Sequence, residues 1–130
     1  MTGDEIREFI QKAIDDNRVM LFMKGSPDQP ACGFSAQTAG VLNAMEVRYA
    51  ALDILPDPRI REELSGISNW PTIPQLFIDG KLIGGCDIVT EMYESGELAE
   101  ALGVEQPEDA HAPEPSPAPQ QPLGLENRLG

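Results

Sequence analysis

The sequence is poor in the residues that stabilise small secreted domains and zinc-binding domains. Its 130 residues include two cysteines, Cys32 and Cys86, and one histidine, His111. A secreted domain of this length usually has more cysteines, and a zinc site needs a fuller set of Cys and His ligands, so we rank both classes low. In a reducing compartment, a cysteine is more often catalytic, redox-active or metal-binding than part of a disulfide.

Long apolar runs and targeting patterns are also missing. No apolar run approaches the roughly 18 residues that a membrane-spanning helix needs. The first residues, Met1 to Glu5, are acidic and have neither the basic start of a secretory signal nor the arginines of a transit peptide. We therefore expect a cytoplasmic protein.

Basic side chains are outnumbered by acidic ones, 9 against 22, which gives a formal net charge of −13 at pH 7. Residues 1–104 hold 17 acidic and 8 basic side chains, a net of −9, so the acidity is not confined to the end of the chain. Such a charge repels phosphate groups. We expect neither nucleic acid nor a membrane surface as a partner.

The chain divides into a patterned part, residues 1–104, and a Pro-rich part, residues 105–130. The second part holds six of the twelve prolines in a mixture with Ala, Gln and Glu that has no periodicity. Such a composition buries too little apolar surface to offset chain entropy, and we predict that residues 105–130 are disordered. His111 lies there, which argues against a catalytic role for it.

Residues 1–104 have the apolar periodicity of one α/β domain. Helices are predicted at about 4–17, 33–45, 57–66, 87–93 and 96–102, and strands at 19–23, 48–54, 75–78 and 81–83. Thr2 and Glu5 have the spacing of a capping box. Asp57 and Pro58 mark the start of a helix, and the Asp79-Gly80 pair predicts a type I′ hairpin turn. This order predicts a mixed four-stranded sheet with helices on both faces.

The segment PACGFS, residues 30–35, joins a loop rich in Gly, Ser and Pro to a helical pattern. Cys32 therefore stands at the N-terminus of a helix, where free N–H groups and the helix dipole favour a thiolate. Ser35 occupies the place of the second cysteine in a Cys-x-x-Cys motif. The simpler alternative is that Cys32 is a small buried apolar residue.

Three further segments can converge with Cys32 at one end of the sheet. Each segment also has a simpler interpretation when it is taken alone. Lys24 would be a solvated lysine after a strand, Pro74 would stiffen a loop, and Cys86 would be a buried structural thiol. Pro74 is also a candidate cis-proline, which would turn the backbone N–H and C=O of Ile73 outward towards a peptide-like ligand.

The segment GGCDI, residues 84–88, adds two glycines that allow close backbone approach, and Asp87 can cap the following helix or accept a bond from an ammonium group. With Lys24, this helix start suits a small ligand that has carboxylates at both ends and an amine at one. Glutathione has that pattern.

Taken together, these motifs resemble the monothiol glutaredoxins, whose signature is Cys-Gly-Phe-Ser. Residues 32–35 match the signature, and the likeness extends to MKG at 23–25, WPTIPQL at 70–76 and GGCDI at 84–88. It spans about residues 4–103, which we predict to be a glutaredoxin domain within residues 1–104. The resemblance implies a thioredoxin-like fold with a glutathione groove.

The resemblance also implies the site residues. Cys32 would be the reactive thiol and the ligand of a [2Fe–2S] cluster shared between two subunits, and the glutathione-contacting residues would be Lys24, Arg61, Ile73, Cys86 and Asp87. Because such a cluster takes soft thiolate ligands, two Cys32 thiolates and two from glutathione complete its set. Implied partners are a second copy in the cluster-loaded homodimer, a BolA-like protein and iron–sulfur client proteins.

The main hypothesis is thus a cluster carrier in iron–sulfur cluster assembly and iron homeostasis. The alternative is a glutathione-dependent thiol–disulfide oxidoreductase that removes glutathione from mixed disulfides with Cys32 alone, at most a weak enzyme because the loop at 26–30 would position a second glutathione poorly. A third hypothesis is redox sensing through a disulfide between Cys32 and Cys86.

Overall fold

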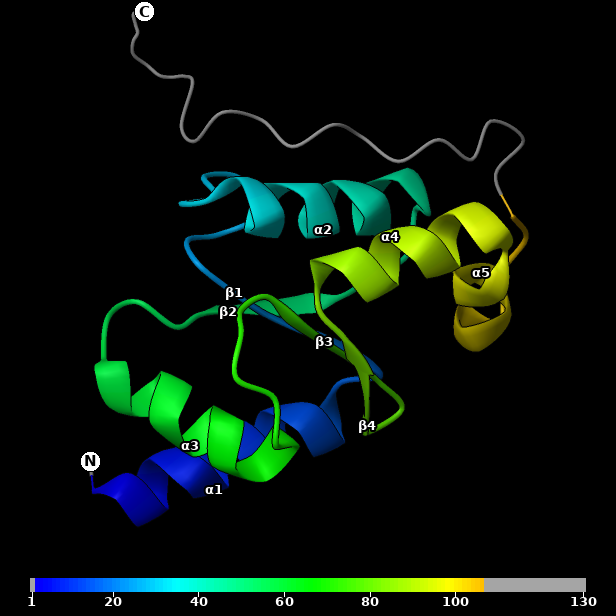
Figure 1. Ribbon diagram of the computed structural model, residues 1–130. Helices are drawn as coiled ribbons and strands as arrows, with labels where there is room; N and C mark the ends of the chain where they lie inside the picture. The colour runs from blue at the N-terminus through cyan, green and yellow to red at the C-terminus, as the bar shows by residue number, and fades with distance from the viewer. Residues whose placement is uncertain (1, 107–130) are drawn as a thin grey trace, which may run out of the picture.

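The computed structural model describes residues 2–106, which form nine elements in the predicted order (Figure 1). They are α1 (Gly3–Asp16), β1 (Val19–Met23), α2 (Gly33–Ala44), β2 (Ala50–Asp53), α3 (Pro58–Ser68), β3 (Gln75–Ile78), β4 (Lys81–Gly84), α4 (Cys86–Ser95) and α5 (Glu97–Leu102). Residues 107–130, on which most of the predicted disordered tail falls, lie outside the described residues, as does His111.

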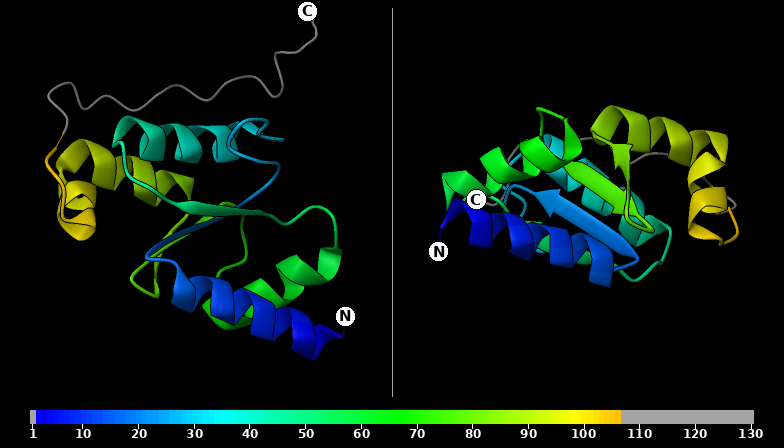
Figure 2. Two further views of the ribbon diagram at one scale, coloured as in Figure 1. Left: turned by 180° about the vertical axis from the view of Figure 1, so that it is seen from behind. Right: turned by 90° about the horizontal axis from the view of Figure 1, so that it is seen from below.

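The four strands form one mixed sheet in the order β2-β1-β3-β4. β1 pairs with β2 in parallel, and the hairpin of β3 and β4 adds antiparallel to β1. Helices α2 and α4 cover one face and α1 and α3 the other, with α5 at one end (Figures 1 and 2). This confirms the predicted mixed sheet between two helical layers.

Strand β1 explains why the sheet needs helices on both faces. Val19, Leu21 and Met23 point into the core shared with α2, α4 and α5, whereas Met20 and Phe22 point into the core shared with α1 and α3. All five side chains are at most 5% exposed. A continuous apolar run is the pattern of a strand buried on both faces.

The local signals of the sequence are realised. Thr2 and Glu5 form both hydrogen bonds of the capping box at the start of α1. Asp79 and Gly80 both have positive φ, 52° and 80°, as a type I′ turn requires. Within residues 2–106, no helix is long and apolar enough to cross a bilayer.

Candidate functional site

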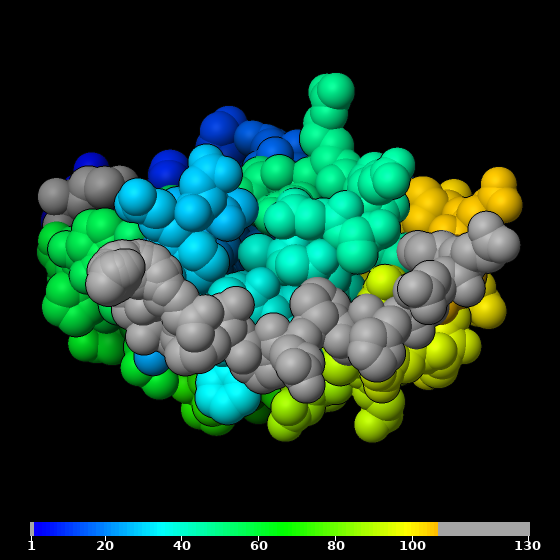
Figure 3. Space-filling view, turned by 90° about the horizontal axis from the view of Figure 1, so that it is seen from above, coloured from blue at the N-terminus to red at the C-terminus, as the bar shows by residue number. Residues whose placement is uncertain are grey.

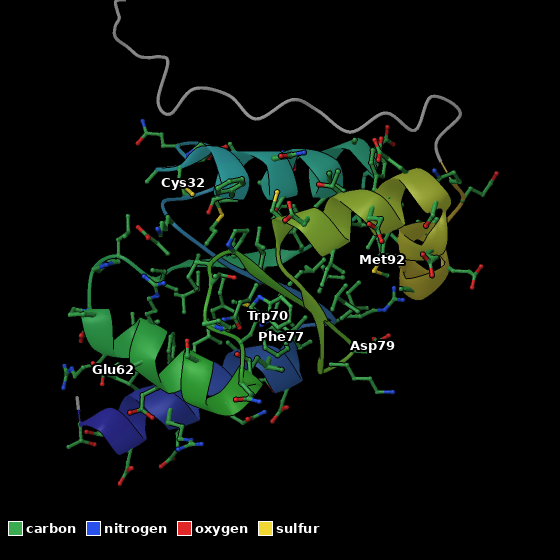
Figure 4. All side chains as sticks on the ribbon, viewed as in Figure 1. Cys32, Glu62, Trp70, Phe77, Asp79 and Met92 are labelled. Atoms are coloured by element: carbon green, nitrogen blue, oxygen red, sulfur yellow. The ribbon has the colours of Figure 1, made fainter. Side chains whose placement is uncertain are left out.

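Cys32 is the N-cap residue of α2 and is half-buried (Figure 4). Its Sγ accepts the backbone N–H of Ser35 at 3.4 Å, and its thiol donates to Ser35 Oγ at 3.3 Å. The prediction of a thiol at a helix N-terminus is confirmed, and Cys32 is not the buried apolar residue of the simpler alternative.

Ser35 connects the cysteine to the end of β1. Its side chain is fully buried, and its Oγ also accepts the backbone N–H of Lys24 at 3.1 Å. Asp53, at the end of β2, accepts the next N–H, that of Gly25, at 2.9 Å. The loop before Cys32 is therefore attached both to the helix that it precedes and to the strand beside it.

A groove of about 240 Å³ lies at the start of α2, the helix that Cys32 caps. Among the expected site residues, Cys32, Lys24 and Arg61 do not line it. Its lining comes from the start of α2, the loop before β3 and the start of α4, and consists of Phe34, Thr72, Ile73, Pro74, Cys86 and Asp87. Three of the expected site residues thus share one cavity although they are far apart in the sequence. Helices α2 and α4, whose first turns line the groove, contact each other. Figure 3 shows the molecule from the side of α2, which is coloured cyan to teal, with part of α4 in yellow-green.

Ile73, in the loop before β3, lines this groove and has a free backbone N–H and a free backbone C=O. The peptide bond between Ile73 and Pro74 is cis, as considered from the sequence. Among the hydrogen bonds of residues 2–106, none involves the backbone N–H or C=O of Ile73. An extended ligand can use such a donor and acceptor as a neighbouring strand would.

The start of α4 differs from the prediction. The helix begins at Cys86, so Asp87 lies inside its first turn and does not cap it. The N-cap is Gly85, which makes no side-chain capping bond and leaves the N–H groups of the first turn free for an anion. A Cβ on Gly85 would lie only 3.3 Å from the Pro74 carbonyl oxygen, which confirms the expected close approach of two backbone segments.

Cys86 is buried, with 7% of its surface exposed. Its thiol donates to Gln37 Oε1 at 3.4 Å, and the Gln37 amide donates to Thr90 Oγ1 at 3.3 Å. These bonds tie α2 to α4. Sequence patterns did not predict a role for Gln37, because no local pattern links residues 49 positions apart.

Four cations in the described part of the chain have no ion pair. Within residues 2–106, the basic side chains that have no carboxylate within 4.0 Å are Lys24, Arg48, Arg61 and Lys81. Lys24 follows β1 and its backbone N–H donates to Ser35, whereas the Arg61 side chain donates to the carbonyl of Pro71, the residue before Thr72 of the groove, at 3.2 Å. In so acidic a protein, unpaired cations are available to an anionic ligand.

Helix α3, which carries Arg61, starts as predicted. Asp57 is its N-cap, accepts the N–H of Arg59 at 3.0 Å, and is followed by Pro58 at the first helical position. Hydrogen bonds from the Arg59 side chain, and then from its backbone, lower the pKa of the Asp57 carboxyl. No group of three or more His, Cys, Asp or Glu side chains in residues 2–106 is arranged to hold a metal ion.

Comparison with known proteins places this geometry among relatives. The sequence model of the Glutaredoxin family matches residues 19–83. The "Probable monothiol glutaredoxin 2" of Rickettsia prowazekii is 49% identical over 102 residues, which cover 78% of this chain and 95% of the relative. "Glutaredoxin 4" of Escherichia coli is 55% identical over 95 residues, which cover 73% of this chain and 83% of the relative.

A solved structure agrees with the fold. The crystal structure of a buckwheat glutaredoxin–glutathione complex superimposes with a TM-score of 0.69 at 25% sequence identity, over 78% of this chain and 90% of that one. The shared architecture is the thioredoxin-like fold expected from the sequence.

Proposed function

This chain is a monothiol member of the glutaredoxin family, and we propose that it binds a [2Fe–2S] cluster as cargo, together with glutathione, and passes it on in iron–sulfur cluster assembly and iron homeostasis. The observation that supports this proposal is one half-buried thiol, Cys32, at the N-terminus of α2, the helix whose first turn lines a groove together with Ile73, the start of α4 and the acidic Asp87. A glutathione in that groove would bring a second sulfur to the Cys32 end of α2.

The groove residues fit glutathione by their chemistry. Lys24 and Arg61 attract its carboxylates, and the free first-turn N–H groups of α4 bind a carboxylate as a helix N-terminus binds anions. Asp87 is exposed and acidic, which suits the ammonium group of the γ-glutamyl end. Ile73 offers one N–H and one C=O to the peptide backbone of the ligand.

Two sulfur ligands per chain lead to a homodimer. Bound glutathione supplies a thiolate beside that of Cys32, and two such chains supply the soft ligands that the cargo needs. Ser35 supports carriage rather than disulfide exchange, because its hydroxyl holds the Cys32 sulfur without competing as a second thiol. Transfer is an exchange of thiolate ligands with an acceptor and requires no net oxidation or reduction.

The proposed partners follow from this arrangement. A BolA-like protein would replace one subunit at the cargo and supply its own ligands, and iron–sulfur client proteins would receive the cargo. Both cysteines are free thiols, which supports a place in the reducing cytoplasm.

Anaerobic reconstitution with iron, sulfide and glutathione tests the proposal. We expect a coloured dimer with about one glutathione and one iron-bound Cys32 per chain, given the ligand count above. Cys32→Ser should remain colourless, whereas Cys86→Ser should still take up a cluster, because the Cys86 thiol is turned towards Gln37. A wild-type protein that stays colourless contradicts the proposal.

The accessible Cys32 favours one second function, the removal of glutathione from mixed disulfides. The Cys32 thiolate would attack the glutathione sulfur, release the client thiolate and keep glutathione as a mixed disulfide; a second glutathione thiolate would then regenerate Cys32 and leave as glutathione disulfide. A colourless protein that rapidly reduces a glutathionylated peptide would favour this function over carriage.

A further inference from the structure

Gln75 is a polar residue in a position where the fold otherwise places apolar ones. It is the first residue of β3, lies opposite Phe22 of β1, and has no exposed surface. Its neighbours along the strand, Leu76 and Phe77, are buried in the two cores. Gln75 is not among the residues that line the groove.

The amide group of Gln75 is used on one side only. Its Nε2 donates to the Trp70 carbonyl at 2.9 Å and to the Thr72 carbonyl at 3.1 Å. Its Oε1 is buried and has no hydrogen-bond partner among the described residues. A buried acceptor left unpaired costs stability, and an apolar side chain of the same size would avoid that cost. A glutamine at this position therefore indicates a role for the two hydrogen bonds that its Nε2 donates.

Those two bonds fix the loop that carries Ile73. Gln75 holds the Trp70 and Thr72 carbonyls, and the Arg61 guanidinium holds the Pro71 carbonyl at 3.2 Å. Three successive carbonyls are thereby bonded to side chains, two to the buried Gln75 and one to the exposed Arg61. Ile73 is the next residue, and its N–H and C=O are the free ones beside the groove.

The other contacts of this loop limit its movement further. Gly85 packs against it so closely that a Cβ there would lie 3.4 Å from Trp70 Nε1 and 3.3 Å from the Pro74 carbonyl oxygen. Figure 4 shows Trp70 on the segment between α3 and β3, below the start of α4. The side of the loop that faces Gln75 is thus bonded, and the side that faces α4 is packed.

We propose that Gln75 is a positioning residue for ligand binding. By holding the Trp70 and Thr72 carbonyls, it presents the backbone N–H and C=O of Ile73 to glutathione, which Gln75 itself does not touch. The inference rests on the proposed function in one respect, that the groove takes glutathione. A preorganised backbone donor and acceptor bind more tightly than mobile ones, because the cost of ordering them is met during folding.

The test compares Gln75→Met with wild type in two measurements on the reduced protein. Affinity for reduced glutathione is measured by titration, and loop order by acrylamide quenching of Trp70, the single tryptophan of the chain. Gln75→Met keeps the length of the side chain and removes both donors. We expect glutathione affinity to fall roughly fivefold to tenfold and Trp70 quenching to increase, with the rate of Cys32 alkylation near that of wild type.

Two controls separate positioning from general loss of stability. Gln106→Met makes the same substitution at a glutamine whose amide donates to the Tyr93 carbonyl at 2.9 Å, away from the groove. Ile10→Val weakens the core beneath the sheet, where Ile10 is fully buried, without touching the loop. Both should bind glutathione as wild type does. If Ile10→Val lowers affinity as much as Gln75→Met, the positioning role is overturned.

A second variant keeps the test decisive if Gln75→Met folds poorly. Gln75→Glu retains the shape, and its carboxyl donates one hydrogen bond only when protonated, so its glutathione affinity should fall more at high pH than at low pH relative to wild type. Glutathione affinity in Gln75→Met equal to wild type, or a pH profile of Gln75→Glu parallel to wild type, overturns the inference. If wild type binds no glutathione, the proposed function fails, and Trp70 quenching alone then decides whether Gln75 holds the loop.

Discussion

The Oγ of Ser35 lies 3.3 Å from the Sγ of Cys32 and at the same time accepts the backbone N–H of Lys24. The residue that stands where a resolving cysteine would be is therefore a fully buried link between the reactive sulfur and the end of β1. Its hydroxyl bonds to sulfur without offering an alternative thiolate. Under the proposed function, Ser35 is therefore the position that separates cluster carriage from disulfide chemistry.

Replacing that hydroxyl by a thiol should redirect the site. In Ser35→Cys, the two sulfurs start within the 3.3 Å that now separates Sγ from Oγ, so a small rotation brings them to bonding distance. We expect oxidised glutathione to convert this variant to an intramolecular disulfide, seen by mass spectrometry as a loss of about 2 Da, with less cluster bound after reconstitution and a gain in dithiol reductase activity. Ser35→Ala removes the hydroxyl without adding a thiol and should show no such gain.

Removal of the two cations proposed to bind glutathione should weaken its binding. Lys24→Gln and Arg61→Gln each delete a positive charge that has no ion pair among the described residues, and we expect each to lower glutathione affinity about twofold to tenfold, with the smaller effect at high salt. Lys81→Gln is the matched control, because Lys81 also has no ion pair in the described part of the chain but lies at the exposed start of β4. Equal losses in all three variants would indicate a nonspecific effect of net charge.

The loop before Cys32 depends on a glycine. Gly25 has φ +84°, and a Cβ there would collide with the Gln29 carbonyl oxygen and lie 2.6 Å from the Ala31 nitrogen. Gly80 has a similar φ of +80° but open space around it. We expect Gly80→Ala to cost about 1 kcal/mol of unfolding free energy from the backbone alone, and Gly25→Ala to cost roughly 1–3 kcal/mol more.

Urea unfolding of both variants measures this difference directly. Cluster yield after reconstitution should fall in Gly25→Ala and not in Gly80→Ala, because Gly25 precedes the reactive cysteine and Gly80 lies in the hairpin turn. Equal stabilities for the two variants would mean that the loop opens to admit a side chain, contrary to its two attachments at Ser35 and Asp53.

Acid should weaken the start of α3. The pKa of Asp57 lies below its ordinary value of 3.8 because the Arg59 side chain and backbone donate to it. A carboxyl whose pKa is lowered by folding stabilises the fold above its unfolded pKa and loses that contribution as the pH falls through its folded pKa. Asp57→Asn should therefore be less stable than wild type near neutral pH, and the gap should close as the pH falls below 3.8. Urea unfolding at several pH values checks this; a gap that persists in acid contradicts it.

The sequence alone determined much of the fold because its signals are local. The apolar run at 19–23 predicted a strand buried on both faces, and the capping box, the Asp57-Pro58 helix start and the Asp79-Gly80 turn each lie within one turn of backbone. The place of Cys32 at a helix N-terminus was equally local, since a Pro-rich loop and a helical pattern meet at that residue.

Only the tertiary structure decided which side chains meet. Cys86 bonds to Gln37 across two helices, Arg61 reaches a carbonyl of the loop before β3, and Gln75 turns from the end of a strand to hold that same loop. The correction at Asp87 has the same origin, because α4 begins one residue earlier, at Cys86, with its N-cap Gly85 packed closely against the Pro74 carbonyl. These contacts depend on sheet register and on how helices pack over it, and periodicity along the chain carries no information about either.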